Sequence, residues 1–133
     1  MLTLQRFRSG KKNEDIVKFP LKGLDLSDYL EKQPGTEEAI PLYDLFGVIN
    51  QVGSLSSGHY TAKCFNEEAD CWYNFDDSRI NKLETKDDAT TSPSSVQDDI
   101  EAQLVTSKAY VLFYKQRSLA ETLNTKEDYE RIK

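Results

Sequence analysis

The chain has 133 residues, a formal net charge of −6, 38% hydrophobic residues and 30% charged residues. This length allows one domain with a modest core, and the acidic balance argues against a nucleic-acid partner and favours a basic protein partner. No apolar run is long enough to span a bilayer and the first residues lack the features of a signal peptide, so we expect no membrane partner and a cytoplasmic or nuclear location.

The N-terminal part predicts two short strands. Leu2–Phe7 alternates apolar and polar residues, and Ile16–Phe19 is a second apolar run that ends at Pro20. We expect the two to pair as a hairpin, with the lysines of the intervening Ser9–Lys12 segment in a solvated turn. One helical turn is predicted at Asp25–Leu30.

The central stretch holds the only histidine, the only tryptophan and both cysteines. Tyr43–Val52 is rich in aromatic and β-branched residues, which indicates a strand with little exposure. Gly53–Gly58 is a small Gly/Ser loop. His59–Phe65 and Cys71–Phe75 then predict an antiparallel hairpin around a polar turn.

The register of this hairpin follows from its turn. If the turn is centred between Glu67 and Glu68, His59 lies opposite Asp76, and Asp77 points away. The other face then carries the more apolar set, which we expect to be the core face: Tyr60, Ala62, Cys64, Cys71, Tyr73 and Phe75.

A histidine held by an aspartate beside a Gly/Ser loop forms two thirds of a nucleophilic triad. The carboxylate fixes the imidazole tautomer, and the other ring nitrogen can take a proton from a serine or cysteine. A purely structural His–Asp pair on a sheet surface is the alternative, and the residues of His59 and Asp76 alone leave both open.

The two cysteines fit neither a disulfide framework nor a tetrahedral zinc set. In the predicted register Cys64 lies opposite Cys71, so a cross-strand disulfide is geometrically conceivable. In a reducing compartment both would be small buried apolar residues. We expect no metal and no cofactor.

The C-terminal third is more mixed. Residues 85–100 are rich in Ser, Thr and Asp and predict a flexible insertion. Val96–Val105 has the apolar spacing of a short amphipathic helix. Ala109–Lys115 predicts a buried strand, and residues 118–133 predict a charged tail with helical propensity after a domain that covers residues 1–117.

Five segments, taken in order, resemble a known family. They are LTLQRF, VKFPLKGLDLSDYL, YDLFGVINQVGSLSSGHYTA, WYNFDDS and AYVLFY, spread between Leu2 and Tyr114. Together they are similar to the C-terminal, histidine-containing half of the ubiquitin-specific protease catalytic domain. That family consists of papain-like cysteine peptidases that cleave after the C-terminal glycine of ubiquitin. The resemblance implies an α+β fold, an antiparallel β-sheet-rich half-domain with few short helices.

The resemblance also implies roles for individual residues. The general base falls on His59 and the orienting carboxylate on Asp76, with Asp77 as a secondary contributor. The expected partner is ubiquitin or a ubiquitinated protein. Residues expected to bind its Gly-Gly tail surround the loop, although that loop could equally be an ordinary connection between strands: Gly53, Ser57, Gly58 and Tyr60.

The chain also departs from the family pattern. It contains no Gly-Asn-x-Cys nucleophile segment, and Cys64 and Cys71 are expected on the face opposite His59. Gln51 stands where the family commonly has a histidine outside the triad. Three hypotheses follow: half of an active cysteine peptidase that needs the N-terminal half as partner, an inactive ubiquitin-binding or scaffold protein, and an unrelated β-rich interaction module.

Overall fold

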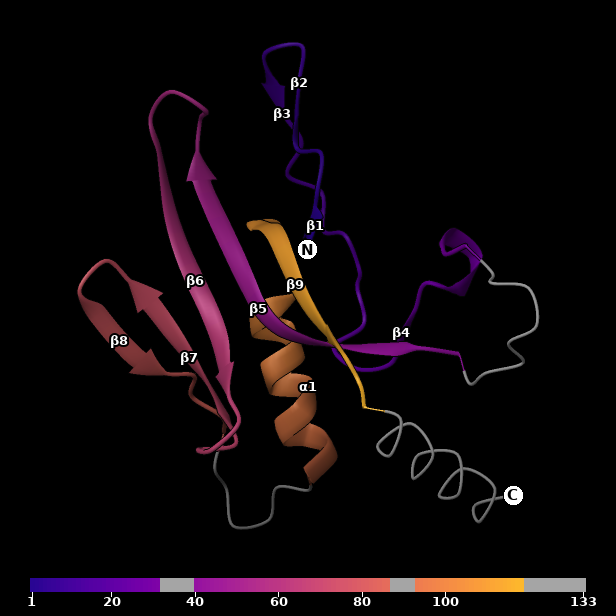
Figure 1. Cartoon of the computed structure of the whole chain (residues 1–133). Helices are drawn as coiled ribbons and strands as arrows, with labels where there is room; N and C mark the ends of the chain where they lie inside the picture. Colours follow the sequence, from indigo (N-terminus) through magenta and orange to yellow (C-terminus); the bar gives the residue numbers. More distant parts are fainter. Residues whose placement is uncertain (32–39, 87–92, 119–133) are drawn as a thin grey trace. The chain divides into compact units, whose positions relative to one another are not determined.

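A computed structural model describes residues 1–31, 40–86 and 93–118 (Figure 1). These residues form β-strands and one α-helix, α1 (Pro93–Leu104), and their sheet is mostly antiparallel, which confirms the predicted α+β class. The chain divides into two compact units, Met1–Phe19 with Phe46–Phe113 and Pro20–Leu45 with Tyr114–Lys133.

Most residues of the main sheet belong to the first unit. The strands of this sheet follow the order β1-β9-β5-β6-β7-β8, and consecutive hairpins join β5 to β6, β6 to β7 and β7 to β8. Their bounds are β1 Leu2–Thr3, β5 Leu42–Gly53, β6 Gly58–Asn66, β7 Cys71–Asp76, β8 Arg79–Lys82 and β9 Ala109–Gln116. Strand β8 was not predicted.

The N-terminal hairpin differs from the prediction. Strand β1 pairs with β9, while β2 (Phe7–Arg8) pairs with β3 (Lys11–Lys12), and Ile16–Phe19 forms no strand. Ser9 and Gly10 both have positive φ angles, 51° and 74°, as a tight two-residue hairpin turn requires. Because this turn closes the chain over a few residues, the local hairpin replaces the longer one that we expected.

The second unit contains a short strand and one tight turn. Strand β4 (Leu24–Asp25) pairs with the first residues of β5, and a 3-10 turn, η1, spans Ser27–Tyr29. The predicted helical turn is therefore present in a shorter form. Arg117 binds the Asp44 carboxylate through two nitrogens, each at 2.8 Å, and the backbone N–H of Gly23 also donates to it.

The central hairpin has the predicted faces but a different register. Lys63 lies opposite Asn74 and Phe65 opposite Trp72, so each pairing is two residues away from the expected one. A shift of two keeps every side chain on its predicted face. The turn Asn66–Asp70 contains Asp70 at φ 49°, and Asn66 pairs with Cys71, so the turn is tighter and centred one residue later than we assumed.

The prediction of which face of this hairpin is buried was wrong. Trp72, on the face that carries His59, is only 8% exposed, whereas Tyr60 and Phe75 on the opposite face are 50% and 37% exposed. The apolar count within two strands could not identify the buried face, because burial also depends on segments far away in the sequence. Deeply buried side chains come from such distant elements of this unit: Val48, Leu104, Ala109 and Leu112.

Helix α1 corrects the extent of the predicted insertion. It begins at Pro93, so the later part of the 85–100 segment is helical. Proline is favoured in the first turn of a helix because its missing N–H has no partner there in any case. Residues 87–92 of the insertion and 119–133 of the predicted tail lie outside the described residues. The described part of the chain contains no helix that is long and apolar enough to cross a membrane.

Candidate active site

The predicted contact between His59 and Asp76 is present. His59 follows the first residue of β6, Asp76 is the last residue of β7, and Nε2 of the imidazole lies 2.7 Å from Oδ1 of the carboxylate. An ionised carboxylate only accepts hydrogen bonds, so Nε2 must carry the hydrogen. The lone pair of the neutral ring is then on Nδ1, which is the nitrogen available as a base.

The contact runs diagonally across the hairpin. In the observed register Asp76 is displaced by two positions from the residue that would lie directly opposite His59. Diagonal neighbours in a sheet remain within reach of long or aromatic side chains, so an imidazole still bridges the gap. This explains why the contact between His59 and Asp76 could be predicted from a register that was off by two residues.

The site is open to water and acidic. The side chains of His59 and Asp76 are 50% and 43% exposed. The hydrogen bond that His59 donates to Asp76 raises the pKa of His59 above its usual value, and the charges of Asp76 and Asp77 raise it further, while desolvation acts in the opposite direction. The two carboxylates therefore make the imidazole of His59 a stronger base than an isolated one.

Asp77 does not point away from the histidine. It occupies the turn after β7 with φ 50°, and the ligand atoms that His59, Asp76 and Asp77 offer all lie within 4.8 Å of one another. This places a second carboxylate near the ring, and its charge also raises the pKa of His59. The same geometry would let the three side chains approach a metal ion, but the acidic groups are exposed and such groupings are common without one.

The predicted tail-binding loop closes the β5–β6 hairpin directly before His59. Gly53 pairs with Gly58, and Gly53 has φ 90°, a conformation that glycine adopts readily. Within the loop the backbone N–H of Ser57 donates to Oγ of Ser54 over 3.1 Å. Tyr60 lies on the other face of the sheet from His59, with its ring 6.4 Å from that of Tyr110. The structure therefore brings Gly53, Ser57 and Gly58 together and separates Tyr60 from them.

Both cysteines lie on the face opposite His59. Cys64 pairs with Tyr73 and Cys71 with Asn66, so the register in which a cross-strand disulfide was conceivable does not occur. Both thiols are free, and burial raises the pKa of Cys64, which disfavours its reactive thiolate form. Neither is placed to exchange a proton with the imidazole.

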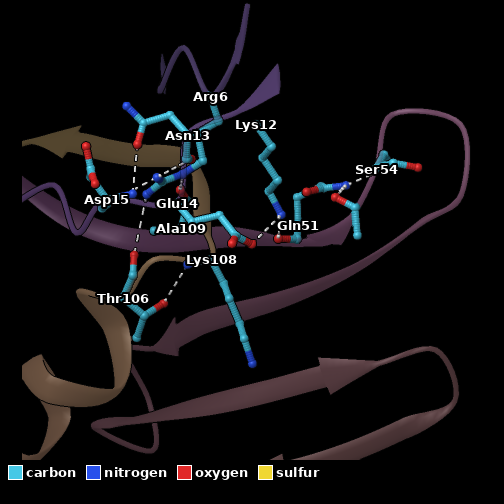
Figure 2. A network of polar contacts seen from close by, with 11 residues as sticks. Arg6, Lys12, Asn13, Glu14, Asp15, Gln51, Ser54, Thr106, Lys108 and Ala109 are labelled. Atoms are coloured by element: carbon cyan, nitrogen blue, oxygen red, sulfur yellow. Dashed lines mark hydrogen bonds and ion pairs between the residues drawn. The ribbon is translucent and has the colours of Figure 1, made fainter. Parts of the chain in front are cut away.

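Sequence reasoning missed the burial of three polar residues in the first unit. Figure 2 shows Arg6, Lys12 and Gln51 in a network of polar contacts that extends to Ser54 in the loop. Arg6 is 2% exposed, Gln51 is fully buried, and only 15% of the Lys12 side chain is exposed, so the expected solvated turn at Lys12 is wrong. Their burial has no local signal in the sequence, because it is created by contacts between distant segments. Nε of Arg6 donates to the carbonyl of Ala109, 103 positions away, over 2.6 Å, and Nζ of Lys12 donates to that of Gln51, 39 positions away.

This arrangement is able to transfer protons, and among the described residues no cysteine lies on the same face as the imidazole. One carboxylate fixes the tautomer of an exposed imidazole, and the free Nδ1 can accept and return a proton.

Comparison with known proteins identifies the context of this site. The family model of ubiquitin carboxyl-terminal hydrolases matches residues 1–114. Human ubiquitin carboxyl-terminal hydrolase 31 is 30% identical over 141 residues, which cover 89% of this chain and 9% of that protein. A putative ubiquitin carboxyl-terminal hydrolase 11 of Arabidopsis thaliana is 36% identical over 130 residues, 94% of this chain and 12% of that protein.

Solved structures give the same result. A structure of the SAGA Ubp8/Sgf11/Sus1/Sgf73 DUB module matches with a TM-score of 0.62 at 27% identity, over 87% of this chain and 23% of the solved chain. The same module bound to ubiquitin aldehyde matches with a TM-score of 0.61 at 25% identity, over 87% and 24%. The chain thus spans about a tenth of the curated relatives and about a quarter of the solved chains. It belongs to the ubiquitin carboxyl-terminal hydrolase family, as part of a papain-like ubiquitin-specific protease domain.

Proposed function

We propose that this chain is the C-terminal half of a cysteine-type deubiquitinase domain, in which His59 is the general base and Asp76 its orienting carboxylate. The observation that carries the proposal is the 2.7 Å contact from Nε2 of His59 to Asp76, which leaves Nδ1 of this half-exposed side chain without a hydrogen bond to any described residue. An exposed structural pair would also leave one ring nitrogen in solvent, and the family of the chain is what favours a base over such a pair.

The proposed reaction uses a cysteine that another part of the domain supplies. Nδ1 of His59 takes the thiol proton, and the thiolate attacks the carbonyl carbon of the terminal glycine of ubiquitin. The imidazolium gives that proton to the departing lysine amine as the amide bond breaks, which leaves a thioester. Nδ1 then takes a proton from water as the hydroxide attacks the thioester, and returns it to the departing thiolate.

The surface beside His59 supports a protein partner there. Val52 lies directly opposite His59 across β5 and β6, and its side chain is exposed. In this proposal the nucleophile-bearing half covers the face that carries the base and contacts Val52 there. The substrate that we propose is ubiquitin in conjugates, and two of the similar solved structures are bound to monoubiquitin or ubiquitin aldehyde.

The test compares the chain alone with the chain plus a nucleophile-bearing N-terminal half. Alone it should not release a fluorophore from the C-terminus of ubiquitin, since neither Cys64 nor Cys71 shares a face with His59. With the other half it should hydrolyse the substrate, and His59→Gln should abolish turnover. Asp76→Asn should lower kcat by orders of magnitude, as the loss of the equivalent aspartate does in serine proteases, at about 10⁴-fold.

A matched control is Asp70→Asn, which changes an exposed aspartate in the neighbouring β6–β7 turn and should leave turnover unchanged. Turnover by the isolated chain that an alkylating reagent blocks would identify one of its own cysteines as nucleophile and overturn the proposal. Ubiquitin binding without hydrolysis by the combined halves would favour an inactive ubiquitin-binding protein instead.

A further inference from the structure

The loop Gly53–Gly58, which directly precedes His59, is anchored by the buried side chain of Gln51. Gln51 in β5 is fully buried, and its Nε2 donates to the carbonyl oxygens of Gly53 over 3.2 Å and Ser54 over 3.1 Å. Figure 2 shows this amide reaching from the strand to Ser54. Both N–H donors of the Gln51 carboxamide are therefore bonded to backbone carbonyls of the loop.

The backbone of Gln51 is fixed on both sides. Its N–H donates to the carbonyl of Lys108 over 2.9 Å, and its carbonyl accepts from Nζ of Lys12 over 3.2 Å. Lys12 is itself held in the N-terminal hairpin, with Nζ 3.7 Å from Glu14 and 5.9 Å from the ring centre of Phe7. The Gln51 side chain is therefore attached to a backbone that is itself fixed by hydrogen bonds on both sides.

Two glycines make room for this amide. A Cβ on Gly58 would collide with Nε2 of Gln51 and would lie 2.6 Å from the carbonyl oxygen of Ser54. A Cβ on Gly53 would lie 2.8 Å from the carbonyl oxygen of Ser57. The absence of a Cβ on Gly58 therefore leaves room for the Gln51 carboxamide. Gln51 bonds to Ser54, and Ser54 bonds in turn to Ser57, which is two residues before His59.

The same amide is costly for the fold. Among the described residues Oε1 of Gln51 finds no hydrogen-bond donor although it is buried. A buried acceptor without a partner is destabilising, and an apolar side chain of the same length would avoid that cost. Stability alone therefore does not account for the amide, whereas its two bonds to the loop do.

We propose that Gln51 is a positioning residue that fixes the loop between Gly53 and Gly58 in the conformation that receives the substrate. In the context of the proposed function, on which this consequence rests, the occupant is the C-terminal tail of ubiquitin. Gln51 does not touch the His59–Asp76 contact, so its loss raises KM more than it lowers kcat.

The experiment uses the isotope-labelled 133-residue chain with Gln51→Met. Methionine keeps the length of the side chain and removes both donors, so the core stays filled. The solvent-exchange rate of the Ser57 amide should rise at least about tenfold, because the loop opens once its anchoring bonds are gone. The ring titration of His59, the only histidine, should stay where it is. Gln51→His keeps one N–H donor and should retain part of the protection.

The matched control is Asn50→Leu, which replaces the neighbouring buried amide on the other face of β5 by an apolar side chain of similar shape. It should leave the Ser57 rate unchanged. An unchanged rate in Gln51→Met, or an equal rise in Asn50→Leu, overturns the proposal. If Gln51→Met does not fold, Gly58→Ala decides, since its methyl group displaces the amide from the other side, and a loop as protected as in the wild type would then refute it.

These rates are measured without ubiquitin and without a nucleophile. A negative result therefore removes the role of Gln51 and leaves the proposed function intact. Failure of the combined halves to hydrolyse ubiquitin conjugates removes the proposed function and leaves the loop result intact.

Discussion

Arg6→Met tests whether the N-terminal segment is locked to the rest of the first unit by one buried cation. Figure 2 shows the guanidinium among backbone carbonyls. Its Nε lies 2.6 Å from the carbonyl oxygen of Ala109, and Nη1 lies 2.8 Å from that of Asp15 and 3.1 Å from that of Asn13. Nη2 approaches the carbonyl of Thr106 at 3.5 Å, a marginal distance.

The expected magnitude comes from two opposing terms. A hydrogen bond to a charged group contributes about 1.5–3 kcal/mol, so the two short bonds of Arg6 contribute about 3–6 kcal/mol. Removing the guanidinium also removes the desolvation penalty of a buried charge, which offsets part of the lost hydrogen-bond energy. We expect a net loss of about 2–4 kcal/mol, which corresponds to a Tm lower by about 10–25 °C for a unit of this size.

The assay is urea unfolding followed by the fluorescence of Trp72, the only tryptophan, which is buried in β7 of the same unit. Arg8→Met is the matched control, because Arg8 is exposed and should change stability by less than about 0.5 kcal/mol. If both variants unfold at the same urea concentration, the carbonyls around Arg6 gain nothing from the guanidinium and the reasoning is refuted.

Three further changes should give distinct results. Because Asp76 raises the pKa of His59, the contribution of the protonated ring to stability is fully present below its unfolded pKa of about 6.5 and is lost as pH rises through the folded pKa. The difference in urea midpoint between wild type and His59→Gln should therefore shrink as the pH rises above about 6.5, and a difference that grows with pH would contradict this. Leu104→Ala should cost about 2–5 kcal/mol in the same assay because Leu104 is fully buried, while Glu101→Ala on the exposed side of α1 should cost far less. Gly53→Ala should destabilise the chain more than Gly10→Ala, because both have positive φ but only at Gly53 would the new methyl group meet backbone, at 2.8 Å, and equal Tm values for the two variants would show that the loop yields freely.

The dyad could be found from the sequence because its contact depends on face more than on exact register. His59 and Asp76 share a face in every register that is shifted from the expected one by an even number of residues, so the error of two residues left them within reach. The side of Asp77 could not be predicted in the same way. It sits in a turn at φ 50°, and alternation along a strand does not extend past the end of β7.

The supports of the site could not be predicted because they join segments that are distant in the sequence. Lys12 had the composition of a solvated turn, yet it donates to the carbonyl of Gln51, 39 positions away. Gln51 was noted only as a departure from the family pattern, and its bonds to Gly53 and Ser54 depend on a loop geometry that residue types do not determine. Hydrophobic periodicity finds strands and faces, whereas buried polar groups follow from which backbone groups are left to be satisfied.

The central claim is that Asp76 holds His59 through Nε2 and tunes its basicity. Its most direct test is an NMR titration of the His59 ring nitrogens in the wild-type chain, Asp76→Asn and Asp77→Asn. We predict a wild-type pKa above about 6.5 and a hydrogen on Nε2 of the neutral ring, a large drop in pKa in Asp76→Asn, and a small drop in Asp77→Asn. A pKa that Asp76→Asn leaves unchanged, or that Asp77→Asn lowers more, would contradict the claim.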